Sequence, residues 1–144
     1  EMDAQTLYTF LNTAVLPAWF LMAAFPNRRV TDRLVLSFAW PAAMAVLYAV
    51  FIVWGMVENA GGAGGMDSLD GLRIAFQNDK VLLAAWIHYL VFDLVAGIWM
   101  VRDNRETGIS PYLMPVFLLF TLMLGPIGWV SYLVARRLRR SRGA

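Results

Sequence analysis

Hydrophobic and polar positions divide the chain into four long apolar runs separated by short polar segments. The runs cover residues 7–25, 34–57, 81–101 and 111–135. A hydrocarbon core of about 30 Å requires about 20 residues of helix, so each run is close to or beyond the length that crosses a bilayer. The pattern predicts an all-α polytopic membrane protein, in which residues 1–144 form one domain around a bundle of four transmembrane helices.

The connection between the second and third runs has two parts. Residues 58–65 contain four glycines and are typical of a flexible loop. Residues 67–77 carry Leu69, Leu72 and Phe76 at helical spacing among polar residues. This second part predicts a short amphipathic helix that lies at the membrane surface, between the second and third spans.

The composition supports a membrane protein and excludes several kinds of site. Hydrophobic residues make up 60% of the chain and charged residues 15%, against about 25% charged in an ordinary soluble domain. The absence of cysteine excludes disulfides, thiolate catalysis and iron–sulfur ligation. With one histidine and no cysteine, we expect no metal site. The net charge of +2 rests largely on an arginine-rich tail, so we expect no nucleic-acid partner.

The distribution of basic residues predicts the orientation. Four spans place both termini on one side of the membrane. That side would carry seven basic residues in the second loop and the tail, against five on the other side. Because basic residues concentrate on the cytoplasmic side, both termini are predicted to be cytoplasmic.

The third run holds two ionisable side chains, which are rare inside a membrane and mark function by default. His88 is the only histidine of the chain, and Asp93 has no basic neighbour in sequence. On a helix they lie roughly 140° and 7.5 Å apart. The face between them is small, aromatic and polar, and we expect it to face the bundle: Ala85, Tyr89, Phe92 and Ala96. The opposite face is aliphatic, and we expect it to contact lipid: Leu83, Ile87, Leu90, Val91, Leu94, Ile98 and Val101.

Polar and small residues in the other runs have a structural and a functional interpretation. Asn12 in the first run needs a hydrogen-bond partner, either on a neighbouring helix or in a ligand. In the fourth run, Gly125 and Gly128 allow close helix approach and Pro126 allows a kink. They predict a packing seam or a cavity lined by backbone.

The chain resembles the neoxanthin-synthase-like family, the plastid proteins named for abscisic acid deficiency and their bacterial relatives. The resemblance rests on residues 12–19 (NTAVLPAW), 86–97 (WIHYLVFDLVAG) and 122–128 (LMLGPIG), and Ser68-Leu-Asp-Gly71 fits the family's loop pattern. It covers most of the chain, and the motif of the third run is its specific part. In plants the family is linked to the formation of neoxanthin from violaxanthin, an isomerisation of an epoxide to an allene. The resemblance implies a membrane protein of this fold, here a bacterial-type member in an inner membrane.

One hypothesis is an enzyme that acts on a carotenoid or related isoprenoid dissolved in the bilayer. Opening an epoxide to an allene requires an acid at the oxygen and a base at a neighbouring C–H bond. His88 and Asp93 are the predicted catalytic residues. Asn12, Trp86, Tyr89 and Phe92 are predicted to bind and position the substrate. An isomerisation requires no metal or redox cofactor, and a bound carotenoid or lipid is the expected ligand.

The alternative hypothesis is a protein without catalytic activity. It is a carotenoid- or quinone-binding module, or a small accessory subunit of a larger photosynthetic or respiratory membrane complex. In that case His88 and Asp93 satisfy each other or bond to the backbone of another helix, and the aromatic residues serve packing.

Overall fold

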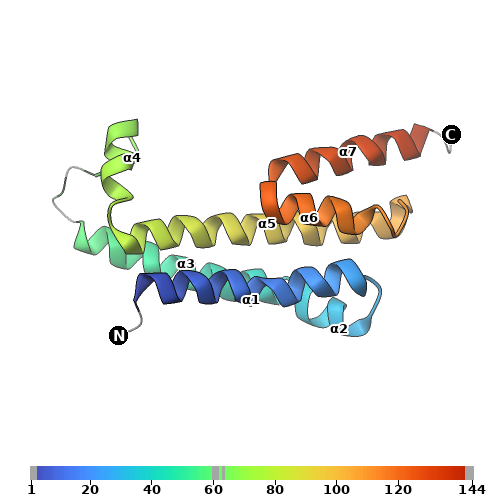
Figure 1. Cartoon of the computed structure of the whole chain (residues 1–144), viewed down its shortest axis with the longest axis horizontal. Coiled ribbons are helices and arrows are strands. Elements are labelled where there is room, and N and C mark those ends of the chain that lie inside the picture. The colour runs from blue at the N-terminus through green and yellow to red at the C-terminus, as the bar shows by residue number, and fades with distance from the viewer. Residues whose placement is uncertain (1–2, 60–61, 63, 142–144) are drawn as a thin grey trace.

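The computed structural model describes residues 3–59, 62 and 64–141, and the regular structure in this part of the chain is helical (Figure 1). In chain order the elements are α1 (Ala4–Ala24), the short turn α2 (Arg29–Thr31), the π-helical turn η1 (Asp32–Leu36), α3 (Ala39–Glu58), α4 (Leu69–Ala75), α5 (Asp79–Thr107), α6 (Met114–Leu124) and α7 (Pro126–Ser141).

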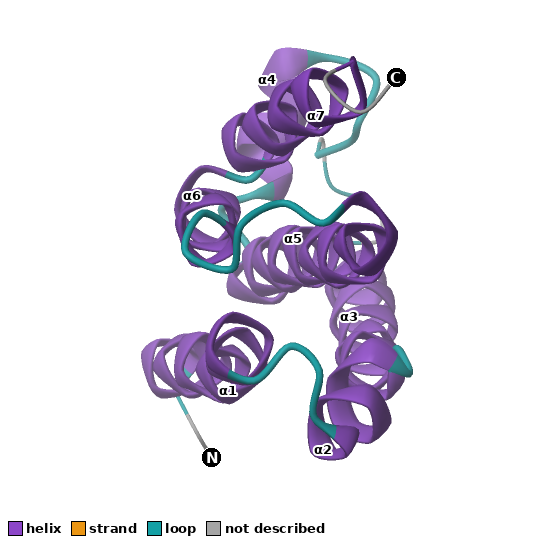
Figure 2. Ribbon diagram, turned by 90° about the vertical axis from the view of Figure 1, so that its right-hand side faces the viewer, coloured by secondary structure: helices purple, strands orange, loops and turns teal. Residues whose placement is uncertain are grey.

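The central element is α5, the longest helix, and α1, α3 and α6 lie around it (Figure 2). Its 29 residues correspond to about 44 Å. The helix is capped at its start by Asn78, whose side chain accepts bonds from the backbone N–H groups of Lys80 and Val81. It ends at Gly108, which has a φ of 67°. Helix α1 runs parallel to α5, whereas α3 and α6 run antiparallel to it (Figure 1).

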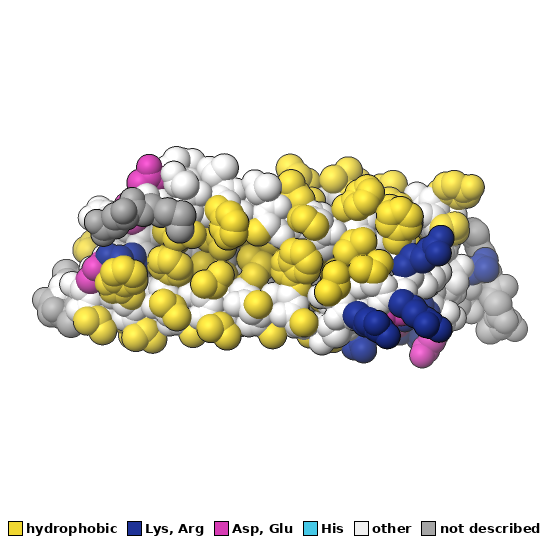
Figure 3. Space-filling view, turned by 90° about the horizontal axis from the view of Figure 1, so that it is seen from below, with side chains coloured by type: hydrophobic (Ala, Val, Ile, Leu, Met, Phe, Trp, Pro, Cys, Tyr) yellow, Lys and Arg dark blue, Asp and Glu magenta, His cyan; other side chains and the backbone are white. Residues whose placement is uncertain are grey.

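Three helical segments are long and apolar enough to cross a membrane: Ala4–Ala24, Arg29–Glu58 and Asp79–Thr107. On the face seen in Figure 3, hydrophobic side chains are spread along the length of the molecule between ends that carry charged residues. Among the hydrophobic side chains of the three segments, Phe20, Val53 and Met56 are each more than half exposed. An apolar outer surface of this extent suits acyl chains rather than water, so the expectation of membrane helices is confirmed for three segments.

The structure does not confirm the predicted fourth span over residues 111–135, because this segment forms two helices. Helix α6 ends at Leu124, and Gly125 adopts a φ of 39° and a ψ of −94°. Pro126, which has no N–H group, then begins α7. With 11 residues, α6 is about 16 Å long and reaches through only about half of a 30 Å core. Helix α7 returns beside α6 (Figure 1), so the segment forms a helical hairpin instead of a crossing.

Small side chains allow the two arms of this hairpin to pack closely. A Cβ atom at Gly128 would lie 2.2 Å from the backbone nitrogen of Thr121 and 2.3 Å from its Oγ1. These distances leave no room for any side chain at position 128. The predicted close approach in this segment is therefore confirmed, although the predicted kink is a full reversal of the chain.

The reversal also gives no support to the prediction that both termini lie on one side. Helix α1 begins at one end of the molecule and α7 ends at the other (Figure 1). The arginines then gather at the end where α1, α5 and α7 finish: Arg28, Arg29, Arg33, Arg102, Arg105, Arg136, Arg137, Arg139 and Arg140. Among the described residues, the opposite end holds two basic side chains, Arg73 and Lys80. This asymmetry predicts that the arginine-rich end is cytoplasmic.

The predicted inner and outer faces of α5 were also wrong. The aliphatic residues that were expected to contact lipid are buried, each at most 8% exposed, whereas Phe92 of the expected inner face is 59% exposed. Because α5 is enclosed by α1, α3 and α6, its aliphatic residues form the core. The error came from the assumption that the third span has one lipid face like the others.

Two further boundaries follow from local backbone geometry. Phe38 has a φ of 63°, so α3 begins at Ala39 and the predicted second span is interrupted near its start. A helix is present between the second and third spans, where the Ser68 side chain accepts a bond from the N–H of Gly71 and starts α4. This helix lies crosswise to α5 (Figure 1).

The two topologies differ in a measurable way, and the absence of native cysteine makes the test clean. We expect a cysteine at Ser110 and one at Ser141 to react with a membrane-impermeant maleimide from the same side of the membrane. A cysteine at Met66, which is 77% exposed, should react from the opposite side. A fourth crossing would instead place positions 66 and 141 on one side. Labelling of intact and permeabilised cells measures the difference.

Candidate functional site

Asp93 occupies the middle of the longest helix. It lies 14 residues from Asp79 and 14 from Thr107, or roughly 21 Å from each end. Its side chain is only 8% exposed. Oδ2 is buried and has no hydrogen-bond partner among the described residues. Buried polar atoms almost always have a partner, so this oxygen requires an explanation. An ionisable group at this depth is a functional candidate.

The carboxyl group faces the turn between α6 and α7. A Cβ atom at Gly125 would lie 2.5 Å from Oδ1 of Asp93, so only glycine leaves room for the carboxyl group in this position. Tyr89 lies one turn earlier on the same face of α5, close to the carboxyl group. Its hydroxyl donates to the carbonyl of Met123 at 3.3 Å. Asp93 therefore faces the backbone of the α6–α7 turn inside an apolar bundle.

Three of the four predicted substrate-binding residues come together beside this point. The indole N–H of Trp86 donates to Oδ1 of Asn12 at 3.2 Å and so joins α5 to α1. The rings of Trp86 and Tyr89 stack at 5.2 Å. A cavity of about 310 Å³ lies between α1, α5 and α6, and its lining includes Asn12, Leu16, Trp86, Tyr89 and Met123. Asp93 follows Tyr89 by one helical turn, directly beyond this cavity.

The structure does not bring His88 and Asp93 together. His88 is exposed on the opposite side of α5, where its ring lies 5.7 Å from that of Tyr48 and 4.7 Å from that of Phe92. Phe92 is exposed on the same outer surface. The predicted site is therefore divided between two faces. Asn12, Trp86, Tyr89 and Asp93 lie on one face, and His88 and Phe92 lie on the other.

Metal ligation has no obvious basis in the part of the chain that the structure describes. No group of three or more histidine, aspartate or glutamate side chains is placed to hold an ion there.

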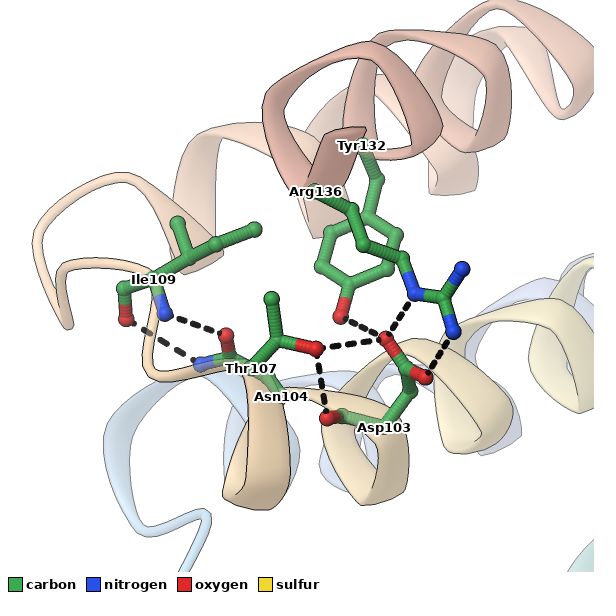
Figure 4. A network of polar contacts seen from close by, with 6 residues as sticks. All are labelled: Asp103, Asn104, Thr107, Ile109, Tyr132 and Arg136. Carbon is green, nitrogen blue, oxygen red and sulfur yellow. Dashed lines mark hydrogen bonds and ion pairs between the residues drawn. The ribbon is translucent and has the colours of Figure 1, made fainter. Parts of the chain in front are cut away.

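A second carboxyl group, Asp103, is fully satisfied (Figure 4). Its Oδ2 accepts bonds from the Tyr132 hydroxyl at 2.7 Å, from Nε of Arg136 at 2.7 Å and from the Thr107 hydroxyl at 3.0 Å. Its Oδ1 accepts a bond from Nη2 of Arg136 at 2.9 Å. The bonds to Asp103 raise the pKa of Arg136. The network fastens α7 to the end of α5 and is structural.

This network was not predicted from the sequence. The sequence feature that could have indicated it is the spacing of Asp103 with Thr107 and of Tyr132 with Arg136. The members of each pair are four residues apart and therefore lie on one helix face. The pairing of these two faces depends on the reversal at Gly125, which the sequence analysis did not predict.

A known protein family matches almost the whole chain. The model of the ABA4-like family, described as ABA DEFICIENT 4-like, matches residues 6–132. The chain belongs to the ABA DEFICIENT 4-like family. This membership confirms the resemblance found in the sequence. The matched region includes Asn12, Trp86, Tyr89, Asp93 and the hairpin turn.

A relative of this ABA DEFICIENT 4-like protein is the chloroplastic protein ABA DEFICIENT 4 of Arabidopsis thaliana. The two are 29% identical over 139 residues, which is 92% of this chain and 61% of the relative. The chain therefore spans about three fifths of the length of the curated relative it matches. No solved structure is significantly similar to the chain.

Substitution of Gly125 tests the geometry around Asp93. Gly125→Ala introduces both an unfavourable backbone conformation, which costs about 1–3 kcal/mol, and a contact with the Asp93 carboxyl group. Gly108 is a matched control, because it also has a positive φ but no atom within 4 Å of an added Cβ. We expect the melting temperature in detergent to fall further for Gly125→Ala than for Gly108→Ala. Equal losses would contradict the close approach to Asp93.

Removal of the Asp103 side chain tests the attachment of α7. Asp103→Ala leaves the buried Tyr132 hydroxyl without its acceptor, and we expect a loss of roughly 1–3 kcal/mol of stability. Asp70→Ala serves as the control, because the pair of Asp70 with Arg73 is exposed and should contribute almost nothing. Thermal unfolding and limited proteolysis near residue 126 report the outcome. An unchanged melting temperature for Asp103→Ala would show that the network does not hold α7.

Proposed function

We propose that this protein binds an oxygenated carotenoid or related isoprenoid within the bilayer and isomerises it. The observation that carries the proposal is the unpartnered Asp93 oxygen beside an aromatic cavity near the middle of the membrane. Membership of the ABA DEFICIENT 4-like family supports a carotenoid-related role, because the resemblance described above links that family to the formation of neoxanthin. The cavity opens between helices, so a ligand dissolved in lipid can enter from the side.

A single carboxyl group can carry the proton through an epoxide-to-allene rearrangement. Protonated Asp93 donates, through the Tyr89 hydroxyl, to the epoxide oxygen while the ring C–O bond breaks. The resulting carboxylate then accepts the proton of the neighbouring vinylic C–H bond, and the electron pair of that bond forms the new C=C bond. The proton count balances, and no oxidant, reductant or metal takes part. Tyr89 suits the relay because a phenol donates and accepts at the same oxygen; its O–H turns from the Met123 carbonyl toward the substrate oxygen in this step.

Asn12 and Trp86 act as binding residues in this scheme. Trp86 presents a flat ring to the cavity, and its bond to Asn12 holds that ring in place. Flat aromatic surfaces favour conjugated chains by stacking. His88 and Phe92 lie outside the cavity, so the scheme assigns them no part in proton transfer.

A second candidate function is an accessory subunit without activity. The exposed His88 favours it, because a polar ring on an apolar outer surface gains a hydrogen bond only from another membrane component. In that case the cavity holds a pigment or quinone without converting it.

Expression in a bacterial host that accumulates epoxy-carotenoids tests the proposal. We expect wild type to form the allenic product. Asp93→Asn should form at least 100-fold less of it, because general acid–base catalysis contributes a factor of about 10²–10⁴. Asp70→Asn is the matched control, because it removes an exposed carboxylate outside the membrane. Chromatography of the pigments gives the product, and immunoblotting of membranes gives the protein level. Conversion by Asp93→Asn at the wild-type rate would exclude the mechanism.

His88→Gln in the same assay separates the single-carboxyl scheme from the predicted His88–Asp93 pair. Product formation near the wild-type level supports the single carboxyl group, whereas its loss at normal protein level supports the pair. A pigment that co-purifies one to one, with no conversion by wild type, would indicate the binding role.

A further inference from the structure

Because the hairpin of α6 and α7 is short, α6 covers only half of α5. Along the other half, this side of α5 has α1 as its one neighbour. Helix α6 meets α5 at Met123 and Tyr89 and then turns back. Between Asp79 and Tyr89, this face of α5 is flanked by α1 alone. Residues on both helices are accordingly open: Tyr8 of α1 is 38% exposed and Leu82 of α5 is 47% exposed. An indentation in the outer surface therefore lies between α1 and α5, in the half of the molecule away from the arginine-rich end.

Two cavities occupy this indentation, and Trp86 lines both. The inner cavity is the one beside Tyr89 described above. The outer cavity also measures about 310 Å³ and is lined by Gln5, Tyr8, Asp79, Leu82 and Trp86. From Asp79 to Asp93, α5 rises by roughly 21 Å. The linings of the two cavities together thus follow the helix from Asp79 to Leu90, about one turn short of Asp93.

The position of the Trp86 ring between the cavities is fixed from α1. Nδ2 of Asn12 donates to the carbonyl of Tyr8 at 2.8 Å, which turns Oδ1 of Asn12 toward the indole N–H. The Tyr8 ring lies 5.3 Å from the Trp86 ring, and the Tyr89 ring lies 5.2 Å from it on the inner side. Three aromatic rings therefore follow one another along the indentation.

We infer that the two cavities form one binding slot for a single straight conjugated chain, with Trp86 as the ring over which the chain lies and Asn12 as its positioning residue. This inference rests on the proposed function, because it identifies how the ligand reaches Asp93. The chain enters from the leaflet at the Asp79 end, and its oxygen-bearing end group comes to lie at Tyr89 and Asp93. The unpartnered oxygen of Asp93 then gains a partner in that end group.

A conjugated chain fits this slot better than a saturated one. A rigid chain loses little conformational freedom on binding, whereas an acyl chain loses rotational freedom along its length. The faces of Tyr8, Trp86 and Tyr89 add stacking with a flat π-system. Asp3 and Asp79 lie near the outer mouth, so a neutral ligand is favoured over a carboxylate.

The test uses the full chain in nanodiscs with the methyl ester of trans-parinaric acid, a straight and neutral conjugated probe. A chiral slot induces circular dichroism in the polyene band, and we expect a saturable signal at one probe per chain. Methyl stearate, the saturated ester of the same length, should displace it poorly. Displacement by methyl stearate at equal affinity would overturn the inference.

Substitutions of Trp86 and of its positioning residue Asn12 test where the probe binds. Trp86→Leu should raise the probe's Kd about two- to tenfold, the equivalent of one aromatic contact. Trp129→Leu is the matched control, because that ring lies on α7 and contacts Trp99. Asn12→Leu should reduce the induced signal, and Asn12→Gln, which keeps an acceptor for the indole, should restore it. Wild-type binding by Trp86→Leu would overturn the inference.

A block of the outer mouth tests the slot without changing any ring. We expect Leu82→Cys to lose probe binding after reaction with a bulky maleimide, and Val130→Cys, on the outer surface of α7, to keep it. Retained binding by labelled Leu82→Cys would overturn the route. These measurements require no turnover. If Asp93→Asn loses product formation but wild type does not bind the probe in the slot, only the slot is therefore contradicted. If the probe binds in the slot but Asp93→Asn forms the product in full, only the proposed mechanism is contradicted.

Discussion

Gly125 has a φ of 39° and a ψ of −94°, a combination that a residue with a Cβ atom rarely adopts, and the chain reverses direction there. Pro126 follows as the first residue of α7, where its missing N–H costs nothing. This backbone constraint turns an apolar run long enough for a crossing into two antiparallel arms. Gly128 then permits the arms to touch at Thr121. The separation of α6 from α7, the end of the molecule at which the α7 arginines lie and the open half of α5 all follow from this reversal.

The sequence predicted the parts of the fold that depend on composition along the chain. Its apolar runs correctly located three membrane helices, and the cap at Ser68 lies within the segment where a helix was expected. The faces of α5 could not be predicted from periodicity, because a helix enclosed by three others buries aliphatic residues that would contact lipid in a peripheral helix. The reversal was also hidden, since Gly-Pro in an apolar run is compatible with a kinked span as well as with a turn.

The candidate site was predicted in part for a related reason. Asn12, Trp86, Tyr89 and Asp93 lie together because positions 86, 89 and 93 share one face of α5, as their spacing requires. His88 and Phe92 belong to another stripe of the same helix, and no sequence rule states which stripe meets α1 and α6. The partner of Trp86 on α1 was foreseen only as a need of Asn12 for some hydrogen bond.

The contrast between the two aspartates of α5 argues that Asp93 is kept for a ligand and not for the fold. Asp103 lies ten residues further along and accepts four bonds, three of which join α5 to α7. Among the described residues, Asp93 makes no hydrogen bond that connects two helices, and one of its oxygens is buried without a partner. An unsatisfied buried polar group lowers stability by roughly 1–3 kcal/mol, and an apolar residue at position 93 would avoid that cost. A carboxyl group with no structural bond, placed against a glycine that leaves just enough room for it, is therefore best explained by a molecule that binds there.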